Sequence, residues 1–529
     1  MLSTLHNEQH KRYALVGLVI LWLGLGTLGH SPWKPDEAAQ FGLALSVWRD
    51  GQWWWPSLAG EPFSDYPPLF AWTQALFMSL FGGLLGLADA ARVAALFYTG
   101  LSFYAMAQAA RHLYGVRQAR VAVLMLMSSL VLCYRSHQGI NETAVLCGYA
   151  LCLAGLSQLG AGNRQAKIMW LLGMLILCAS HSVQAAILMC TVPLALGTTQ
   201  SPAEASATQS APSLAQWQSR LAALLIFGGL VLTRQQLSWH GVWYFVQFVF
   251  WATLPAWPLA AWSVYLMRRG FLGGFSAHGF RLPVCFFLIV FGWLILTAEP
   301  YDVNGLPLLL PLVLLAVPGI EYLKREHSGL LDWVGIALFA ALIIAAWVYW
   351  SALYFGWPRG PLKTLTGRIA PGYLEPVVWW RVALALVFTT AWIVVIRPAR
   401  RANHRAIVNW AVGITAAWGV ATTLFMPYLE YANGYGKLLT ELAPHLPRNA
   451  CVASRNVGDN QRALLDFHLR LHTEREERTP QHQCQWLLQL GKAEQLKAFA
   501  TLDSSWQLRW QGSRPGDSNE PWQLFQKVR

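Results

Sequence analysis

Long apolar blocks follow one another from the N-terminus to about residue 426, separated by short polar segments. A bilayer core about 30 Å thick needs about 20 apolar residues for each helix that crosses it. Only 12% of the residues are charged, against about 25% in soluble domains, so a soluble, disordered or small disulfide-stapled protein is excluded. The sequence predicts an α-helical polytopic membrane protein with about 13 transmembrane helices, at residues 13–30, 91–110, 119–134, 143–160, 167–180, 182–198, 220–237, 243–267, 281–298, 306–323, 333–355, 378–396 and 406–426.

The formal net charge of +13 lies mostly between these apolar blocks. If 67–87 is a helix in the membrane interface rather than a span, five basic segments fall on one side of the membrane, as the positive-inside rule requires. They contain Arg111, Arg117, Arg120, Arg164, Lys167, Arg268, Arg269, Lys324, Arg325, Arg397, Arg400, Arg401 and Arg405. The charge therefore indicates orientation and not a nucleic-acid partner. It predicts a cytoplasmic N-terminus and a C-terminal region on the outer side of the membrane.

The chain changes character after residue 426. Residues 427–529 carry 13 Lys and Arg and 11 Asp and Glu, the mixture of a soluble domain. Their pattern predicts a helix over 460–471 and strands over 484–490, 506–510 and 522–528, hence a small α/β domain outside the membrane. An external location permits a disulfide between Cys451 and Cys484, but two free thiols fit the sequence equally well.

Acidic residues gather in the first external loop, residues 31–90. Asp36 and Glu37 follow the first span directly, and Glu61 and Asp65 come later in the same loop. A carboxylate at the membrane rim is costly unless it is paired, solvated or functional. We interpret Glu61 as ordinary loop polarity and Asp36–Glu37 as a candidate general base for deprotonating an acceptor. The three tryptophans at 53–55 suit either a membrane-interface belt or stacking on sugars.

The same loop resembles a known family. Pro35-Asp-Glu-Ala38, Asp50-Gly-Gln-Trp53, Leu58-Ala-Gly-Glu-Pro-Phe63 and Asp65-Tyr-Pro-Pro-Leu69 are similar to the first external loop of the ArnT and protein-O-mannosyltransferase group (families 39 and 83). The tail segment 510–524 and the external C-terminal region resemble the ArnT branch. The resemblance implies a GT-C fold over 1–426 and transfer of a sugar from a polyprenyl-phosphate donor to a lipid (lipid A-like), glycan or protein acceptor at the periplasmic face.

The resemblance also implies roles for single residues. Asp36 matches the family's presumed base or acceptor-orienting carboxylate, and Glu37 matches its neighbour. Asp65 stands where the family has Glu, and Glu142 stands near the acidic residue that opens the fourth span. Tyr66 replaces the Lys before Pro-Pro, and Ala39 replaces an Arg. We therefore expect Asp65, Tyr66 and Glu142 to contact substrate.

The replaced Lys and Arg would stabilise the departing anionic phosphate, so other cations must take their place. Candidates on the external side are Lys34, Arg135, His137, Arg359 and Lys363. The alternative for the arginines and lysines is attraction to lipid headgroups, and for His137 it is a plain hydrogen-bonding role.

The sequence contains no Cys/His set with zinc-ligand spacing and no Walker or Rossmann glycine motif. We therefore expect no required cofactor, although a divalent metal at the external carboxylates stays an alternative. Two other functions also stay open. One is a transporter or flippase of a polyprenyl-linked sugar, and the other is a catalytically inactive relative that only binds the lipid.

Overall fold

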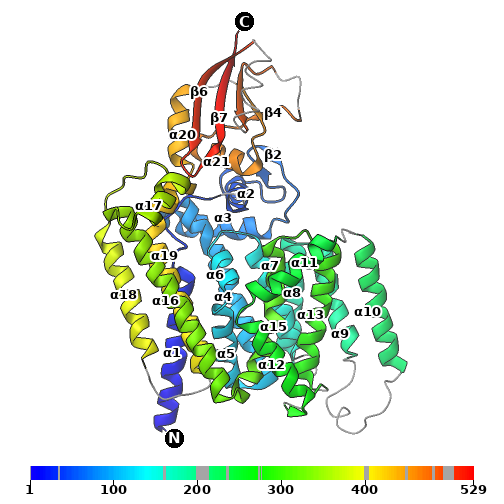
Figure 1. The fold of residues 1–529 in the computed structure, drawn as a ribbon. Coiled ribbons are helices and arrows are strands. Elements are labelled where there is room, and N and C mark those ends of the chain that lie inside the picture. Colours follow the sequence, from blue (N-terminus) through cyan, green and yellow to red (C-terminus); the bar gives the residue numbers. More distant parts are fainter. Residues whose placement is uncertain are drawn as a thin grey trace. The chain divides into compact units, whose positions relative to one another are not determined.

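The computed structural model is mostly helical and divides into two compact units (Figure 1). It describes residues 2–33, 36–158, 163–197, 214–233, 238–271, 274–275, 277–397, 404–446, 451–478, 483–491 and 505–528. The first unit comprises residues 1–25, 95–341 and 389–418, and the second comprises 26–94, 342–388 and 419–529. Four long helices, given below, pass from one unit into the other or mark their boundary.

The first unit is a helix bundle. Its helices are α1 (Leu2–Gly24), α4 (Leu87–Tyr114, from residue 95), α5 (Val116–Met127), α6 (Leu130–Ser136), α7 (Glu142–Leu156), α8 (Arg164–Ser180), α9 (Val183–Leu196), α10 (Leu214–Leu232), α11 (Trp239–Ala252), α12 (Ala256–Arg268), α13 (His278–Thr297), α14 (Asp302–Gly305) and α15 (Leu309–Gly319), with parts of α16 (Arg325–Phe355), α18 (Trp379–Ile396) and α19 (Arg405–Asn433). Short 3-10 turns, Leu306–Leu308 and Ile320–Tyr322, flank α15.

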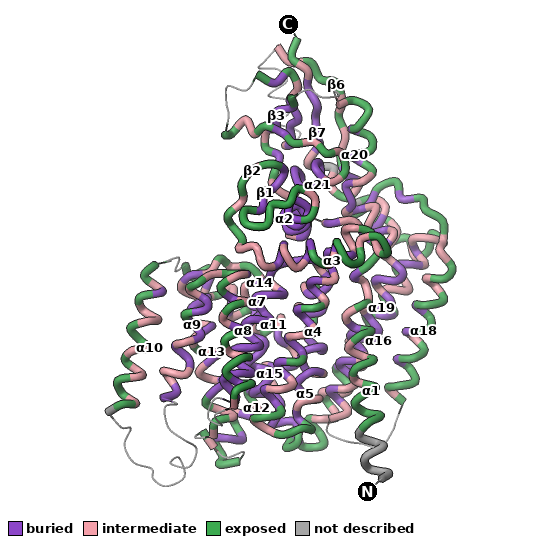
Figure 2. Tube along the Cα trace, turned by 180° about the vertical axis from the view of Figure 1, so that it is seen from behind, coloured by how far each residue is buried: buried purple, intermediate pink, exposed green. Residues whose placement is uncertain are grey.

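Helix α15 is the core of this bundle. All eleven of its residues are buried, and they are almost all apolar (Figure 2). A helix that is hydrophobic on every side needs neighbours on every side. Helices α7 and α8 approach closely through glycines, because a Cβ at Gly173 would lie 2.6 Å from the carbonyl oxygen of Gly148. Small residues at such crossings are typical of membrane bundles.

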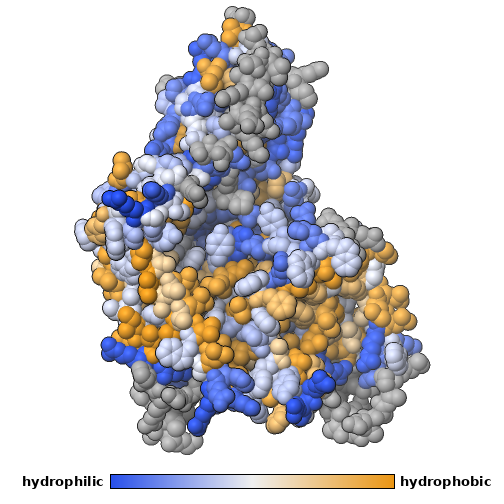
Figure 3. Space-filling view, viewed as in Figure 1, coloured by the Kyte–Doolittle hydropathy of each residue, from blue (hydrophilic) through white to orange (hydrophobic). Residues whose placement is uncertain are grey.

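Seven helices among the described residues are long and apolar enough to cross a bilayer, or eight if the pair α5 and α6, bent by 73°, forms one span. Hydrophobic side chains cover much of the outward surface of the helical part in Figure 3. A polytopic membrane protein is therefore confirmed. Helices α7 and α9 are apolar but shorter than this limit, and the predicted number of about 13 spans stays a prediction.

The second unit combines helices with a five-stranded sheet. Besides the remaining parts of α4, α16, α18 and α19, it holds α2 (Asp36–Asp50), β1 (Ser57–Leu58), β2 (Glu61–Pro62), α3 (Leu69–Leu85), α17 (Arg359–Thr364), a π-turn at Leu365–Ile369, α20 (Gly436–Leu442), a 3-10 turn at Ala443–His445, β3 (Val452–Arg455), α21 (Asp459–Leu469), β4 (Glu474–Arg475), β5 (Trp486–Leu490), β6 (Trp506–Arg514) and β7 (Asp517–Lys527).

The sheet has the strand order β4-β3-β5-β7-β6. Strand β3 runs parallel to β4 and β5, whereas β7 runs antiparallel to β5 and β6. The predicted helix and strands of the tail are present at α21, β5, β6 and β7. Cys451 and Cys484 form a disulfide with their Cα atoms 4.9 Å apart, which decides between the two alternatives left by the sequence. The domain boundary at residue 426 stays a prediction.

Helix α2 is buried on all sides by α3, α21 and the start of α4 (Figure 2). Gly42 marks the closest approach, because a Cβ there would lie 2.6 Å from Cβ of Ala463 on α21. Helix α3 covers the predicted interfacial segment 67–87 as one helix. It buries Phe70, Ala71, Ala75 and Met78 and exposes the apolar side chains of Leu76, Leu80 and Leu84. Its depth in a membrane stays a prediction.

Candidate active site

Asp36 and Glu37 are the first two residues of α2. Carboxylates in the first turn of a helix are stabilised by the helix dipole. Asp36 is half-buried, and Glu37 is buried with 5% of its surface exposed. Because every residue from Glu37 to Val47 is buried, α2 has no free face along which it could shift. The fold therefore fixes the backbone that carries Asp36.

Glu37 is held by a buried arginine of α4. Arg92 is 1% exposed, and its Nε donates a hydrogen bond to Oε1 of Glu37 at 2.5 Å. The backbone N–H of Trp33 donates to Oε2 at 3.0 Å. Burial is the largest single effect and raises the pKa of Glu37, but the charge of Arg92, the nearby His30 and the hydrogen bonds from Arg92 and Trp33 together outweigh burial, so the pKa lies below its usual value. Glu37 is therefore a fixed anion and not a proton donor.

Arg92 uses its other nitrogens to hold the residues that lead into α2. Its Nη1 donates to Oδ1 of Asp89 at 2.5 Å, and its Nη2 donates to the carbonyl oxygen of Ser31 at 2.8 Å. Nδ1 of His30 lies 3.1 Å from Nη2. Burial, reinforced by the charge of Arg92, lowers the pKa of His30, so His30 is neutral at pH 7. One cation thus faces two carboxylates and a neutral imidazole.

A third carboxylate, that of Glu430, binds the segment before α2 although it lies about 400 residues later in the chain. Oε2 of Glu430, on α19, accepts hydrogen bonds from the backbone N–H of Ser31 at 3.0 Å and from Nε1 of Trp33 at 2.8 Å. The N–H of Gly29 donates to Oδ2 of Asp89 at 2.9 Å. We call Gly29–Trp33 with Glu37, Asp89, Arg92 and Glu430 the buried charge network. Its hydrogen bonds hold the backbone of Gly29 and Ser31, in the segment that precedes Asp36.

The opposite end of α2 is held by another ion pair. Arg49 donates from Nη1 and Nη2 to the two carboxylate oxygens of Asp466 on α21, both at 2.9 Å. Asp466 is 5% exposed. A bidentate pair of this kind fixes direction as well as distance. Helix α2 is therefore anchored by charge at both ends and by apolar packing between them.

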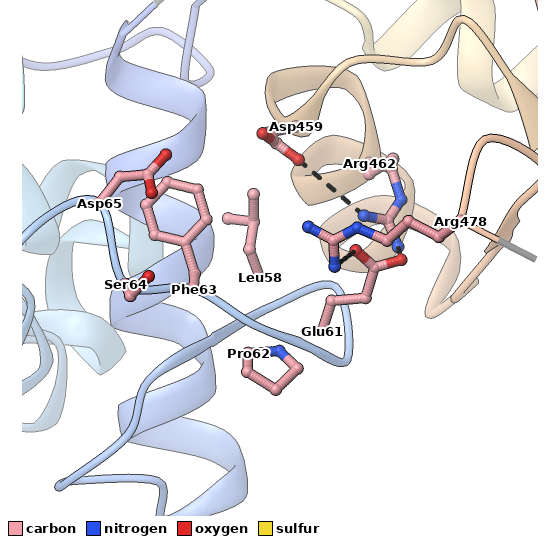
Figure 4. A pocket seen from close by; sticks show the side chains of 9 residues that line it. All are labelled: Leu58, Glu61, Pro62, Phe63, Ser64, Asp65, Asp459, Arg462 and Arg478. Carbon is pink, nitrogen blue, oxygen red and sulfur yellow. Dashed lines mark hydrogen bonds and ion pairs between the residues drawn. The ribbon is translucent and has the colours of Figure 1, made fainter.

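Asp65 lies in a separate, open pocket of the same unit (Figure 4). The pocket lies open to solvent between residues 58–65 and α21, and Glu61, Asp459, Arg462 and Arg478 contribute to its lining. Asp65 and Tyr66 are exposed, and the Tyr66 ring stacks on Phe63 with a centroid distance of 5.8 Å. The structure thus places Asp65 among mixed charges rather than in the buried charge network.

Glu61 does more than add polarity to a loop. Its carboxylate pairs with Nη2 of Arg462 at 2.7 Å and with Nη1 of Arg478 at 2.8 Å, and Nε of Arg475 lies at 3.5 Å. The three arginines belong to α21 and to the segment around β4. Glu61 therefore ties the first external loop to the sheet-containing tail, a role that the loop sequence alone does not indicate.

Three predicted site residues belong to the first unit. Arg135 on α6 pairs with Asp302 on α14, with Nη2 and Oδ1 at 2.6 Å. His137 is buried; its Nε2 lies 2.6 Å from the carbonyl oxygen of Trp22, and its Nδ1 contacts that of Cys133. Glu142 is half-buried at the start of α7. Their roles toward a substrate stay predictions.

The remaining predicted cations differ in what the structure shows of them. Arg359 and Lys363 are exposed one turn apart on α17, so they share a face of that helix in the second unit. Lys34 lies outside the described residues. Among the described residues, the one set of three side chains close enough to share a metal ion is Cys451, Glu474 and Cys484. Its two sulfur atoms are bonded to each other. A divalent metal at the carboxylates of residues 31–90 stays a prediction.

The sequence analysis missed Arg92, Asp89, Glu430 and His30. One signal was available, because Arg92 stands near the start of a predicted span, where a charged residue is costly and usually paired. Glu430 gave no such signal, because its partners lie 397 and 399 residues away in the chain.

Comparisons with known proteins agree with this architecture. Residues 65–214 match the family model described as dolichyl-phosphate-mannose-protein mannosyltransferase. The crystal structure of ArnT from Cupriavidus metallidurans in the apo state is similar to the model with a TM-score of 0.66 and 15% identity, covering 98% of each chain. The same protein bound to undecaprenyl phosphate is similar with a TM-score of 0.65 and 15% identity, covering 97% of this chain and 98% of that one. No curated protein matches the chain. The resemblance carried by residues 35–82 is therefore confirmed, and the chain has the GT-C fold of ArnT.

Proposed function

We propose that the protein is a membrane glycosyltransferase that moves a sugar from a polyprenyl-phosphate donor to an acceptor at the periplasmic face. The observation that carries this proposal is the position of Asp36. It is a half-buried carboxylate at the start of a fixed helix, and its neighbour Glu37 is locked by Arg92. The ArnT fold over nearly the whole chain, and the undecaprenyl phosphate bound by that relative, support a lipid-carried donor.

The reaction is a single displacement with inversion at the anomeric carbon. An oxygen of the acceptor attacks this carbon while the bond to the phosphate oxygen breaks, and the polyprenyl phosphate leaves with the bonding electrons. Asp36 takes the proton from an acceptor hydroxyl, or orients an acceptor that is already ionised. Arg359 and Lys363 are candidates for stabilising the departing phosphate, together with Lys34.

The experiment is a transfer assay with purified protein, a radiolabelled polyprenyl-phosphate sugar and a panel of lipid, glycan and peptide acceptors. We expect labelled acceptor from the wild type. Asp36→Asn should lose activity by 10²–10⁴-fold, the usual contribution of a general base, with an unchanged melting temperature. Asp50→Asn is the matched control, because Asp50 stands at the other end of the same helix. Wild-type activity in Asp36→Asn would contradict the role of Asp36.

A second candidate function is lipid binding without catalysis. It rests on two positions, 39 and 66, where the family has a cation and this chain has none. Ala39 is buried on α2, and Tyr66 is exposed and stacks on Phe63, which lines the open pocket. A relative that binds the lipid without turnover would lack these cations. Tight binding of polyprenyl phosphate with no labelled product from any acceptor would favour it, whereas movement of intact donor across a vesicle membrane would favour a flippase.

We further propose that five more spans complete the predicted number of about 13: α1, the shorter helices α7, α8 and α9, and α11 with α12 as one span. The N-terminus would then lie in the cytoplasm of a bacterial inner-membrane protein and the sheet in the periplasm. The disulfide of the tail supports an oxidising environment. A C-terminal reporter that is active only in the periplasm tests this orientation. Activity of a cytoplasmic reporter at the same position would contradict it.

A further inference from the structure

We propose that the open pocket beside Asp65 binds the carbohydrate portion of the acceptor. This inference rests on the proposed function for the word acceptor, but the carbohydrate site itself stands on the pocket. The pocket belongs to residues 58–65 and to α21 with the segment after β4, all in the second unit (Figure 4).

The lining offers both kinds of hydrogen-bonding partner that a sugar needs. Glu61, Asp65 and Asp459 present carboxylate oxygens, which accept, and Arg462 and Arg478 present guanidinium groups, which donate. A sugar hydroxyl donates and accepts at once, so neighbouring hydroxyls can bridge a carboxylate and a guanidinium. A free phosphate only accepts at its charged oxygens, and three carboxylates around the pocket would repel it.

The pocket also has an aromatic wall. Phe63 is half-buried, lines the pocket and stacks on Tyr66, so the pair forms a small rigid ring surface. The C–H face of a sugar ring packs on such a surface while its hydroxyls point toward polar groups. The charged side chains of the pocket and the aromatic wall of Phe63 together favour a sugar over a peptide side chain or an acyl chain.

Arg462 adds an unsatisfied donor. Its side chain is 1% exposed, its Nη2 is taken by Glu61, and its Nε contacts Oγ1 of Thr473 at 3.3 Å. Its Nη1 is buried, lies 3.9 Å from Oδ1 of Asp459 and makes no hydrogen bond among the described residues. Buried donors without a partner are rare and costly. A hydroxyl placed between Asp459 and Arg462 would supply the missing acceptor.

Binding of free sugars to the purified full-length protein tests this inference by calorimetry. The probes are mannobiose, chitobiose, glucosamine 6-phosphate and inorganic phosphate. The protein is kept in an ethylene-oxide detergent, because maltoside detergents carry a sugar themselves. We expect at least one saccharide to bind, and we expect Arg478→Ala and Asp65→Asn each to weaken that binding about tenfold or more.

Arg478 suits this test because Glu61 keeps Arg462 and Arg475 when Arg478 is removed. The matched control is Arg509→Ala, an exposed arginine of β6 that contacts Gln526, and it should bind as the wild type does. No saccharide binding, binding that both pocket variants retain, or binding of inorganic phosphate alone would overturn the inference.

The Asp36→Asn protein separates the two proposals. It should bind the saccharide with wild-type affinity although it transfers no sugar. Saccharide binding in a wild-type protein that shows no transfer would overturn the proposed function and leave a carbohydrate site. Transfer to acceptors with no dependence on Arg478 or Asp65 would overturn the pocket and leave the proposed function.

Discussion

Residues 31–90 carry two acidic regions that differ in their surroundings. Around Asp36 and Glu37 the charges are buried, and Arg92 is 1% exposed. Around Glu61 and Asp65 the charges face an open pocket, and Arg478 is 58% exposed. The same residue types therefore have different roles. The buried charges fix the backbone around Asp36, whereas the charges of the open pocket are accessible to a ligand.

The largest effect is expected for Arg92→Met. The substitution leaves Glu37 and Asp89 without their shared cation, and removal of one partner from a buried ion pair costs about 3–5 kcal/mol. We expect a lower melting temperature and loss of sugar transfer. Arg117→Met is the control, because Arg117 is 65% exposed and its pair with Glu321 at 3.6 Å contributes little. Equal effects of the two substitutions would contradict the distinction between buried and open charges.

A smaller effect is expected for Glu430→Gln. The amide still accepts one hydrogen bond from Ser31 or Trp33, but the carboxylate charge is lost. Hydrogen bonds to charged groups contribute about 1.5–3 kcal/mol and neutral ones about 0.5–1.5 kcal/mol, so stability should fall by about 1–2 kcal/mol. The transfer rate should fall as well, because the segment before Asp36 is loosened. Glu441→Gln on the exposed side of α20 is the control; a similar loss of rate there would argue against a local role for Glu430.

Arg478→Ala should barely change stability. Exposed ion pairs contribute about 0–1 kcal/mol, and Glu61 keeps two other arginines. The melting temperature should shift by no more than a degree or two, while saccharide binding weakens. A large loss of stability would mean that the open pocket is a structural clamp and would remove the contrast between the two regions.

The smallest effect is expected from pH. The pKa of His30 is lowered by burial and by Arg92, so this contribution to stability is complete above pH 6.5 and is lost as the pH falls toward the folded-state value. The pKa of Glu37 is also lowered, since the charge of Arg92 and the hydrogen bonds from Arg92 and Trp33 act together against burial. Its contribution is complete above pH 4.5 and is lost as the pH falls below that value through the folded-state pKa. Melting temperatures from pH 8 to pH 3 should fall in these two stages.

His30→Gln isolates the first stage, because the chain contains 13 histidines besides His30. Below pH 6.5 the melting temperature of the variant should fall less than that of the wild type. Below pH 4.5 the two melting temperatures should fall alike. An unchanged difference between the wild-type and variant curves across this range would contradict the assignment.

The sequence predicted the helical membrane class because apolar length is a local property, readable without partners. The strands of the tail and α21 followed from local periodicity in the same way. The motif of residues 35–82 led to the GT-C fold and to Asp36. The buried charge network could not be predicted, since Arg92 meets Glu37, and Glu430 meets Ser31 and Trp33, only after separate helices have packed. The arginines that hold Glu61 were hidden for the same reason.

The hydrogen bonds between Glu430 and the segment Ser31–Trp33 have a consequence for how the protein is synthesised and folded. Its two halves are separated by about 400 residues, and ribosomes add about 5–20 residues per second. The segment before Asp36 therefore emerges on the order of 20–80 s before Glu430 exists. During that time the segment before Asp36 and Glu37 lacks the hydrogen bonds that Glu430 makes to it. A chain that stops before α19 should never acquire a working centre, however well its earlier helices insert.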